Sequence, residues 1–212
     1  MDKKNILITG VKGFIGSNLF MYLKKKGYKV FGVSKRLEYE LKKIKNVDFI
    51  IHCAGSGTAR LGNKENYKKN YLPTRSIVKF CKKKKKKPTI IFMSSYSIYG
   101  FIKSSSAKEN DLPMPISSYA KTKKLCEDLL LKHNKSNKIN IKILRLSSIY
   151  GNGIKKQIFF DACKKISQKQ STFFGTGNEI RDWLHISDLC DFISKILRNP
   201  KNRYKIINCG YG

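Results

Sequence analysis

Apolar positions along the chain follow two spacings that alternate. Short continuous runs rich in β-branched residues predict buried strands, and runs with apolar residues three or four positions apart predict helices. The strands are expected at 5–9, 29–34, 47–53, 89–94 and 141–146, and the helices at 17–26, 37–44, 66–84 and 119–133. Apolar strands that alternate with helices are typical of a parallel sheet covered on both faces. The pattern therefore predicts an α/β fold with a doubly wound parallel sheet.

Glycines follow the first predicted strand at Gly10, Gly13 and Gly16, immediately before the first predicted helix. Glycine permits a tight turn and lets the backbone approach a pyrophosphate, while the helix N-terminus offers free N–H groups and a positive dipole end. Phe14 and Ile15 lie between the last two glycines. This placement between strand and helix predicts a dinucleotide-binding loop and a Rossmann-like fold.

The end of the second predicted strand bears on which dinucleotide is bound. A carboxylate there would hold the ribose 2′-hydroxyl of NAD, but residues 33–36 read Val-Ser-Lys-Arg, with no acid. Ser34 and Arg36 would instead suit a 2′-phosphate, so the sequence favours NADP over NAD. The alternative is that Lys35 and Arg36 are only two surface bases of a basic chain.

Ser95, Tyr119 and Lys123 form a second candidate site. Tyr119 and Lys123 stand four positions apart and so share one side of a helix. A nearby ammonium favours the phenolate form, which would make Tyr119 a usable proton donor and acceptor. Ser95 ends a predicted strand and would hydrogen-bond the same reacting oxygen. Chance matches to this spacing are common in a lysine-rich chain, so the weight comes from its place in a nucleotide-binding sheet.

After about residue 150 the alternation loosens. A helix near 157–168, a polar segment at 175–179, a helix near 187–197 and a strand at 204–208 follow. We expect a dinucleotide-binding domain over 1–148 and a small, incomplete substrate-binding region over 149–212. The strand near 204–208 is expected to return to the main sheet.

The charge does not decide the function. The 212 residues carry 45 basic and 14 acidic side chains, a formal net charge of +31, which alone suggests nucleic acid or an anionic membrane surface. However, 38 of the 45 basic residues are lysine and 7 are arginine, whereas readers of nucleic acid lean on the planar fork of arginine. The lysine run at 82–87 is interpreted as the solvated end of a helix. No nucleic-acid partner is expected.

The sequence has no segment typical of membrane insertion or export. No apolar run approaches the roughly 18–20 residues of a spanning helix, and the N-terminus lacks a signal-peptide pattern, so a cytoplasmic protein is expected. The cysteines show no CxxC pair and no histidine at ligand spacing, which argues against a metal site and against a disulfide framework. They are Cys53, Cys81, Cys126, Cys163, Cys190 and Cys209.

Three other side chains are interpreted as structural. His52 and His185 have no partner at ligand or triad spacing, so both are expected to be packing or hydrogen-bonding residues rather than catalysts. Trp183 is expected to lie in a core rather than to form a platform for substrate.

Eight stretches match one family pattern in order and span nearly the whole chain. They are TGVKGFIG (9–16), HCAG (52–55), Asn70, SSYSIYG (94–100), YAKTK (119–123), LRLSSIYGNG (144–153), GNEIRDWLHISDL (177–189) and INCGYG (207–212). On these the chain resembles the extended short-chain dehydrogenase/reductase group, the NAD(P)-dependent epimerase/dehydratase enzymes that act on nucleotide sugars. The RDWLHISDL block discriminates best, because it separates sugar-nucleotide enzymes from the smaller classical dehydrogenases.

The resemblance implies a role for each matching residue. Tyr119 would be the catalytic acid/base, Lys123 would hold the nicotinamide ribose, and Ser95 would orient the sugar oxygen. Arg181 would contact the substrate diphosphate, and Ser148, where the family usually has asparagine, would be a further substrate contact. The cofactor-binding residues would be Gly10, Gly13, Phe14, Ile15, Gly16, Ser34, Arg36, Ala54, Asn70, Tyr119 and Lys123. No metal ion is implied.

Several positions depart from the family pattern. Family dehydratases carry an Asp-Glu pair after the catalytic Ser or Thr, whereas this chain has Tyr96 and Ser97, which disfavours dehydration. Only 35 residues separate Gly16 from His52, so one strand–helix unit on the adenine side is expected to be reduced or missing. The helices that close over the sugar in the family, beyond the segment matching 207–212, are expected to be absent.

The function expected is that of an NAD(P)-dependent nucleotide-sugar epimerase or 4-keto-sugar reductase, with hydride transfer between a sugar carbon and the nicotinamide. An epimerase would return the hydride to the other face of the ketone, whereas a reductase would release the alcohol. The alternative is a truncated, catalytically silent dinucleotide-binding remnant. The expected partner is a nucleotide sugar. The resemblance also implies a homodimer, because family members often dimerise through the two helices here at 66–84 and 119–133. The alternative is that the amphipathic stripe of each helix packs against the chain's own sheet.

Overall fold

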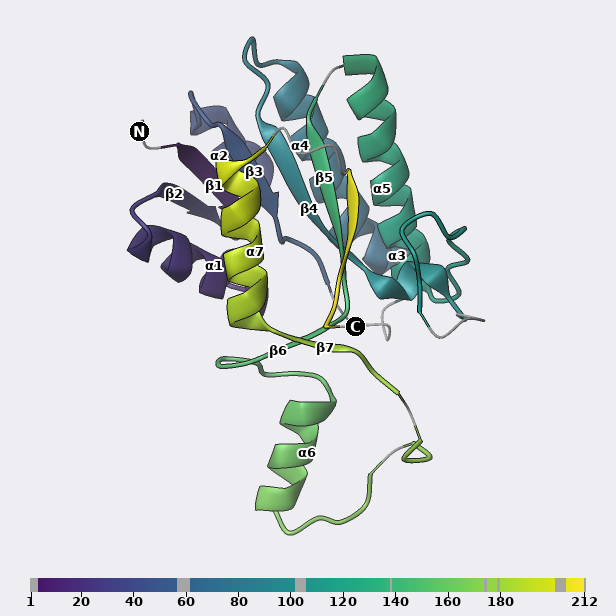
Figure 1. Ribbon diagram of the computed structural model, residues 1–212. Helices are drawn as coiled ribbons and strands as arrows, with labels where there is room; N and C mark the ends of the chain where they lie inside the picture. The colour runs from purple at the N-terminus through teal and green to yellow at the C-terminus, as the bar shows by residue number, and fades with distance from the viewer. Residues whose placement is uncertain are drawn as a thin grey trace.

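Six parallel strands form the main sheet of the computed structural model (Figure 1). The structure describes residues 4–56, 62–101, 106–137, 139–173, 175–178, 180–200 and 205–211. From edge to edge the strands are β2 (Lys29–Val33), β1 (Asn5–Thr9), β3 (Phe49–His52), β4 (Thr89–Ser95), β5 (Ile141–Leu146) and β8 (Ile206–Cys209). With β1 between β2 and β3, the strand order reverses there, as in doubly wound α/β folds. The predicted fold class is confirmed.

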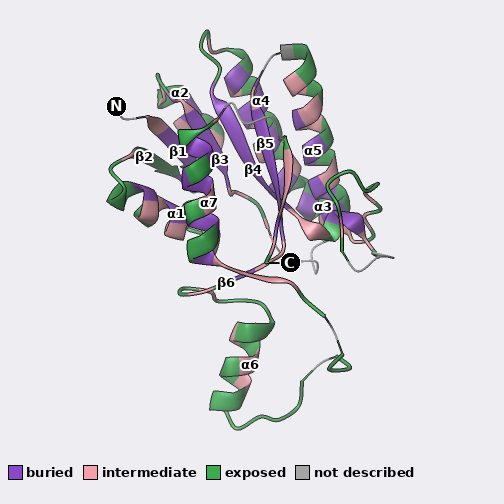
Figure 2. Cartoon of the chain, viewed as in Figure 1, coloured by how far each residue is buried: buried purple, intermediate pink, exposed green. Residues whose placement is uncertain are grey.

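Helices cover both faces of this sheet, and each face has its own apolar core (Figure 2). The helices are α1 (Phe14–Lys25) and α7 (Ile186–Arg198) on one face, and α2 (Leu37–Lys43), α4 (Leu72–Lys82) and α5 (Ser118–Asn137) on the other. Leu19 and Ile193 belong to the first core together with Ile8, and Ile77 belongs to the second together with Ile50. Burial on both faces explains why the strands read as continuous apolar runs. None of the helices within the described residues is long and apolar enough to cross a membrane.

The segment expected to be one helix over 66–84 is helical from 63 to 82 and consists of three consecutive pieces. These are α3 (Asn63–Asn66), a π-helical turn (Tyr67–Tyr71) and α4. The N–H of Leu72 bonds to the carbonyl of Tyr67, five residues earlier. Pro73 follows, and it has neither an N–H to donate nor room for the carbonyl four residues before it, so the α-helical ladder is interrupted. The predicted helix is therefore confirmed as a helical segment over 63–82, but it contains a π-helical turn that the prediction did not include.

Strand β2 is an edge strand because the chain makes one strand between β1 and β3. No further strand lies outside β2 within residues 4–56, as the short interval between Gly16 and His52 led us to expect. A groove of about 620 Å³ runs along this edge and the end of α2, and Lys29 and Phe31 are among the residues that line it. None of the lining residues belongs to β4 or α5.

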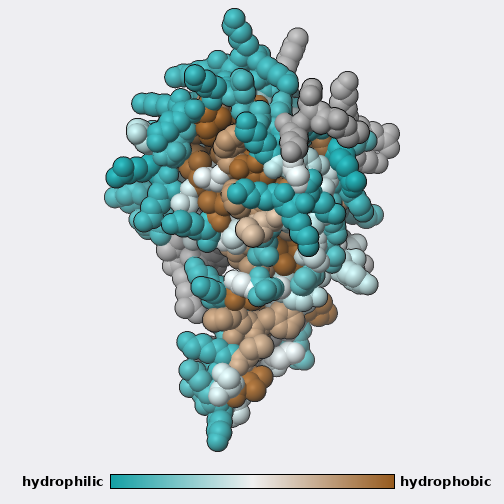
Figure 3. Space-filling model, turned by 90° about the vertical axis from the view of Figure 1, so that its left-hand side faces the viewer, coloured by the Kyte–Doolittle hydropathy of each residue, from teal (hydrophilic) through white to brown (hydrophobic). Residues whose placement is uncertain are grey.

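A small lobe projects from the carboxyl edge of the sheet (Figure 1). It contains two strands that pair in parallel, β6 (Ser148–Tyr150) and β7 (Trp183–His185), and helix α6 (Ile158–Ser167). The rings of Phe159 and Trp183 lie 4.2 Å apart between centroids, so Trp183 packs in a half-buried aromatic cluster. Helix α6 buries none of its residues, and Figure 3 shows apolar side chains at the surface of the lobe.

The strand expected near 204–208 returns to the main sheet as β8. Its Ile207 pairs with Leu144 of β5, and the predicted return is confirmed with a start two residues later. Strands β6 and β7 were not predicted. The division of the chain at residues 148 and 149 into two domains stays a prediction.

Candidate active site

The loop after β1 needs glycine at two positions, because backbone atoms of neighbouring residues occupy the space that a side chain would fill. Gly10 has a φ of +71°, and a Cβ there would lie 2.7 Å from backbone atoms of Ala54. A Cβ on Gly16 would overlap the carbonyl oxygen of Gly10, to which the N–H of Gly13 donates a hydrogen bond of 2.9 Å. These contacts bring the loop after β1 against the loop after β3, where open α/β sheets bind ligands.

Helix α1 begins in this loop without a side-chain cap. Gly13 is the N-cap residue, and Phe14 and Ile15 form the first turn, half-buried against one apolar core. The first N–H groups of a helix have no partner within the helix, and together with the dipole they suit an anion such as a pyrophosphate. The glycine cradle and the helix end therefore fit a dinucleotide.

The end of β2 lies against the same loop. The carbonyl of Val33 accepts hydrogen bonds from the N–H groups of Gly10 (2.7 Å) and Val11 (3.3 Å). Ser34 and Arg36 follow directly and are exposed, with Arg36 in a left-handed conformation at the start of α2. The structure thus brings both residues beside the candidate pyrophosphate site.

Lys123 is a buried cation beside the loop after β3. Its Nζ donates to the carbonyl oxygen of Met93 at 2.7 Å and lies 5.8 Å from the ring centroid of Tyr119. The same Nζ lies 3.7 Å from the point where a Cβ on Gly55 would sit. The ammonium therefore stands between the candidate acid/base and the loop after β3.

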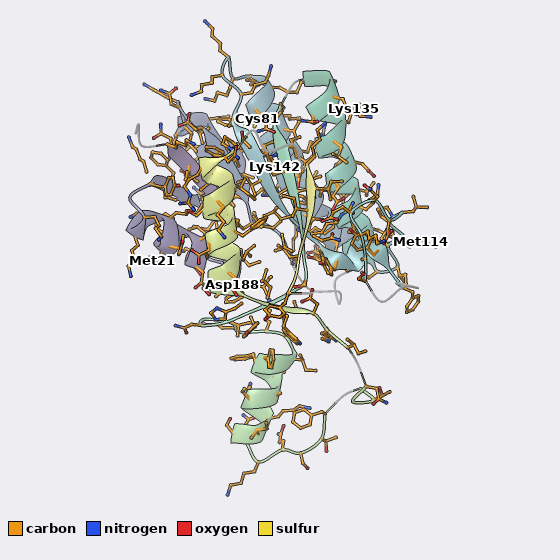
Figure 4. The ribbon with its side chains drawn as sticks, in the orientation of Figure 1. Met21, Cys81, Met114, Lys135, Lys142 and Asp188 are labelled. Atoms are coloured by element: carbon orange, nitrogen blue, oxygen red, sulfur yellow. The ribbon has the colours of Figure 1, made fainter. Side chains whose placement is uncertain are left out.

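Ser95 and Tyr119 lie at the same edge of the sheet. Ser95 ends β4, and its Oγ accepts from the N–H (3.2 Å) and the hydroxyl (3.0 Å) of Ser97. Tyr119 is the second residue of α5, a helix capped by Ser117, whose Oγ accepts from the N–H of Ala120 at 3.1 Å. In Figure 4 this end of the molecule carries the labelled Asp188 and Met114, whereas Lys135 lies at the far end of α5.

Asn70 places a buried amide oxygen against Gly55 of the loop after β3. The residue is 1% exposed, and its Nδ2 donates to the carbonyl of Asn66 at 3.1 Å. Its Oδ1 is buried and has no hydrogen-bond partner within the described residues. That oxygen lies 2.5 Å from the point where a Cβ on Gly55 would sit. A buried acceptor left unmatched is uncommon in native structures, so it marks a place where a bound molecule would donate.

The two predicted substrate contacts outside the sheet lie in the lobe, one at the start of a strand and one just before the other strand. Ser148 begins β6, and its N–H donates to the carbonyl of Asp182 at 3.0 Å. Arg181 precedes β7 and is exposed. The structure thus places Ser148 on β6 and Arg181 two residues before β7, the strand that pairs with β6, beyond the carboxyl end of β5.

Comparison with known proteins decides the family. Residues 6–210 match the model of the NAD dependent epimerase/dehydratase family. The chain belongs to this family. An ADP-L-glycero-D-manno-heptose-6-epimerase from Brachyspira hyodysenteriae is 28% identical to it over 98% of this chain and 76% of the relative. The extended short-chain dehydrogenase/reductase resemblance is confirmed.

Solved structures of family members superpose on most of the chain. A UDP-glucuronic acid 4-epimerase from Bacillus cereus, in complex with UDP-glucuronic acid and NAD, is 28% identical with a TM-score of 0.86, over 97% of this chain and 77% of that one. MoeE5, in complex with UDP-glucuronic acid and NAD, is 25% identical with a TM-score of 0.88, over 98% and 77%. Both relatives hold NAD, whereas Ser34 and Arg36 led us to favour NADP.

Tyr96 occupies a position where family dehydratases carry an acid. Its hydroxyl lies 3.0 Å from the point where a Cβ on Gly210 would sit, and a carboxylate oxygen of Asp182 would overlap the same point. The other oxygen of Asp182 accepts from the N–H of Tyr211 at 2.8 Å. Burial, and then the nearby Asp182, raise the pKa of Tyr96 to about 12. Tyr96 is therefore a neutral phenol where a dehydratase would need a proton-exchanging carboxyl group.

A buried ion pair behind the site was not predicted from the sequence. Arg145 of β5 and Glu127 of α5 are 3% and 1% exposed and meet through two hydrogen bonds of 2.9 and 3.3 Å. The guanidinium also donates to Tyr99 Oη at 2.7 Å, and Tyr99 donates to Asn208 Oδ1 of β8 at 2.7 Å. This network joins β5, α5 and β8. The available signal was an arginine inside the apolar run 141–146.

His52 and His185 are hydrogen-bonding residues, as predicted. His52 is buried, with its ring nitrogens 2.7 Å from Thr9 Oγ1 and 3.0 Å from Thr74 Oγ1. Burial, and then the charge of Lys123, lower the pKa of His52 to about 3. His185 caps α7, with Nδ1 2.7 Å from the hydroxyl of Ser187.

Proposed function

We propose that this chain is a nucleotide-sugar epimerase or 4-keto-sugar reductase that uses a nicotinamide dinucleotide and Tyr119 as the acid/base. The observation that carries the proposal is the position of Lys123, whose ammonium stands between the Tyr119 ring and the loop after β3. A cation there would stabilise the phenolate of Tyr119 and donate to a ribose hydroxyl of the dinucleotide. Both tasks suit one buried ammonium.

Each residue of the candidate site would have its own role in the reaction. NAD(P), when bound, would supply the hydride acceptor and donor for the sugar carbon. Tyr119 Oη would take the proton of the sugar hydroxyl as that carbon is oxidised and would return it when the carbonyl is reduced. Ser95 Oγ would hydrogen-bond the same sugar oxygen and hold it in line with Tyr119. Gly10, Gly13 and Gly16 would let the pyrophosphate approach the backbone.

The proposed substrate is a uridine or related nucleoside diphosphate sugar. The guanidinium of Arg181 is exposed beyond β5 and would bind the diphosphate in a two-point contact, with Ser148 beside it. The solved relatives with the ligands named above bind UDP-glucuronic acid, so UDP-sugars are the first to test. Dehydration is disfavoured because Tyr96 and Ser97 supply no carboxylate.

For the cofactor we propose NAD, the dinucleotide held by the solved relatives, with NADP as the alternative supported by Ser34 and Arg36. Thermal unfolding with each dinucleotide distinguishes them, since a ligand at about a hundred times its dissociation constant stabilises the folded state by about 2.7 kcal/mol. A shift with NADP alone would make Arg36 a 2′-phosphate ligand. Cofactor that copurifies with the protein would favour the epimerase, which retains it through each cycle.

We also propose a dinucleotide-binding domain over 1–148 and a substrate-binding region over 149–212.

We further propose a homodimer that forms through α4 and α5. Leu72 at the start of α4 and Leu125 on α5 are exposed, which supports a helical contact between copies. Light scattering of the wild type and of Leu125→Lys tests it, and a wild-type monomer at micromolar concentration would exclude the dimer.

The activity test incubates the protein with NAD or NADP and with UDP-glucuronic acid or UDP-glucose, and follows the sugar by proton NMR. We expect a new epimer in these mixtures, or, in separate mixtures that supply NADH or NADPH with a 4-keto nucleotide sugar, oxidation of the reduced cofactor as the ketone becomes an alcohol. Either activity should fall at least about 100-fold in Tyr119→Phe. Tyr28→Phe, a half-buried tyrosine between α1 and β2, is the matched control. Cofactor binding without turnover of any nucleotide sugar would favour the silent remnant.

A further inference from the structure

A chain of buried hydrogen bonds runs behind the candidate cofactor crevice. The N–H of Ala54 donates to Thr9 Oγ1 at 3.2 Å, and Thr9 Oγ1 lies 2.7 Å from Nδ1 of His52. On the other side of the ring, Nε2 lies 3.0 Å from Thr74 Oγ1, which donates to the carbonyl of Asn70 at 2.8 Å. Thr9, His52, Thr74 and Asn70 are each at most 1% exposed. The chain links β1, β3 and α4 to the π-helical turn.

One tautomer of His52 gives every hydrogen in this chain an acceptor. Because the Thr74 hydroxyl donates along its own helix, its lone pairs accept from an Nε2–H of His52. Nδ1 is then an acceptor, and the Thr9 hydroxyl donates to it. In the other tautomer the Thr9 hydroxyl would face an N–H, and no second acceptor for it is found within the described residues. Burial keeps the ring neutral, so these roles are fixed.

The far end of the chain sets the direction of Asn70. Its carbonyl is held by Thr74, and its Nδ2 is held by the carbonyl of Asn66. These two bonds leave Oδ1 buried, without a partner within the described residues, and aimed at Gly55. Pro73 interrupts the α-helical hydrogen bonds and so gives rise to the π-helical turn that carries Asn70. A side-chain hydrogen bond is therefore needed to hold the backbone of this turn. Thr74, next to Pro73, supplies it.

We propose that His52 is a positioning residue that acts through Thr74 to hold Asn70 Oδ1 toward a hydroxyl of the bound dinucleotide ribose. The inference rests on the proposed function, because it requires a dinucleotide in the crevice beside Gly55. His52 touches neither cofactor nor substrate. Its other nitrogen, through Thr9, holds the N–H of Ala54, so one ring fixes both the loop after β3 and the amide that faces it.

The test removes one hydroxyl and restores it. Thr74→Val keeps the shape of the side chain and loses the donor, whereas Thr74→Ser keeps the hydroxyl. Thr89→Val is the control, since Thr89 is also buried, lies at the opposite end of β4 and accepts from Asn140 Nδ2 at 3.2 Å. Calorimetric titration with NAD and NADP gives the dissociation constant of each variant, and melting temperatures are recorded alongside.

We expect Thr74→Val to weaken dinucleotide binding about tenfold, the effect of one lost hydrogen bond. Thr74→Ser is expected within about twofold of the wild type, and Thr89→Val unchanged even if its melting temperature falls. If valine and serine at position 74 behave alike, the inference is wrong, while wild-type binding leaves the proposed function standing. If the wild type binds neither dinucleotide, the proposed function itself fails.

A second measurement needs no variant. Nitrogen NMR of the histidine-labelled wild type reports which ring nitrogen carries the proton. We expect His52 as the neutral Nε2–H tautomer from about pH 5 to about pH 8. A ring protonated at Nδ1 in this range, alone or together with Nε2, would overturn the hydrogen-bond directions on which the inference depends.

Discussion

Nζ of Lys123 donates a hydrogen bond to the main-chain carbonyl oxygen of Met93, 2.7 Å away, and so ties α5 to β4. The residue is 6% exposed, and the ring of Phe92 lies 4.8 Å from the ammonium. One helical turn earlier, the ring of Tyr119 faces the same charge. In a chain with 38 lysines, this one is distinguished by burial and by a fixed partner, and not by its charge.

Replacing this ammonium should separate its chemical role from its packing. We expect Lys123→Met to lower the turnover of a nucleotide sugar by at least about 100-fold, because the ammonium proposed to hold the dinucleotide ribose beside Tyr119 is lost. The pKa of His52 should rise from about 3, since the charge of Lys123 adds to burial in lowering it. Lys121→Met, on the exposed side of α5, is the control. Equal activity of the two variants would exclude Lys123 from the chemistry.

The loop after β1 gives a test of the cofactor site by backbone geometry. Gly16→Ala would place a methyl group on the carbonyl oxygen of Gly10, so either α1 or the loop must shift. We expect dinucleotide binding to weaken at least about tenfold, together with a lower melting temperature. Gly62→Ala is the matched control, because none of the described residues lies within 4 Å of its added Cβ. Unchanged binding by Gly16→Ala would mean that the pyrophosphate does not use this turn.

The elements that could be predicted from the sequence are those whose apolar residues recur at the regular spacing of a strand or a helix. The strand at 141–146 was predicted to the residue, because continuous apolar runs mark strands buried on both faces. The Tyr119–Lys123 pair was likewise visible from its helical spacing. Strands β6 and β7 were missed because each has three residues and finds its partner more than thirty positions away along the chain, which leaves no local signal.

The rest of the site depends on contacts that sequence spacing does not contain. Asn70 was assigned to the cofactor from a family motif. The direction of its Oδ1 follows from the π-helical turn over Tyr67–Tyr71, which ends two residues before Pro73 in an otherwise helical pattern. His52 was correctly expected to be a hydrogen-bonding residue, yet its partners Thr9 and Thr74 come from two other elements. Only the tertiary fold brings Thr9 and Thr74 to His52, so the spacing of residues in the sequence could not identify them.

Replacing one partner of the buried pair of Arg145 and Glu127 should lower the free energy of unfolding more than replacing both partners. Arg145→Leu would leave a carboxylate buried without its cation, and we expect a loss of about 3–5 kcal/mol in the free energy of unfolding. Arg145→Leu with Glu127→Leu should recover much of that loss, because no unpaired charge remains. Lys124→Ala, which removes an exposed pair with Asp128, should cost less than about 1 kcal/mol. Urea denaturation measures all three, and equal losses in the single and double variants would contradict the assignment.

His52 also predicts how stability depends on pH. Its pKa is about 3 in the folded protein, lowered by burial and then by Lys123 from an ordinary value of 6.5. Below pH 6.5 the unfolded chain binds a proton that the folded protein refuses, so stability is full above that pH and falls as the pH approaches about 3. The slope from this one group is about 1.4 kcal/mol per pH unit.

His52→Gln isolates this contribution, because the glutamine amide can still donate to Thr74 but does not titrate. Asp48 also loses stabilising interactions in acid: burial alone would raise its pKa, but the hydrogen bonds from Lys86 and from the N–H of Asn5 lower it. The wild type and His52→Gln share this contribution of Asp48, so it cancels when their free energies of unfolding are subtracted. We expect urea denaturation between about pH 7 and about pH 4 to show the wild type losing stability faster than His52→Gln. Parallel curves would mean that His52 is protonated in the folded protein and that its bonds to Thr9 and Thr74 are not those of a neutral ring.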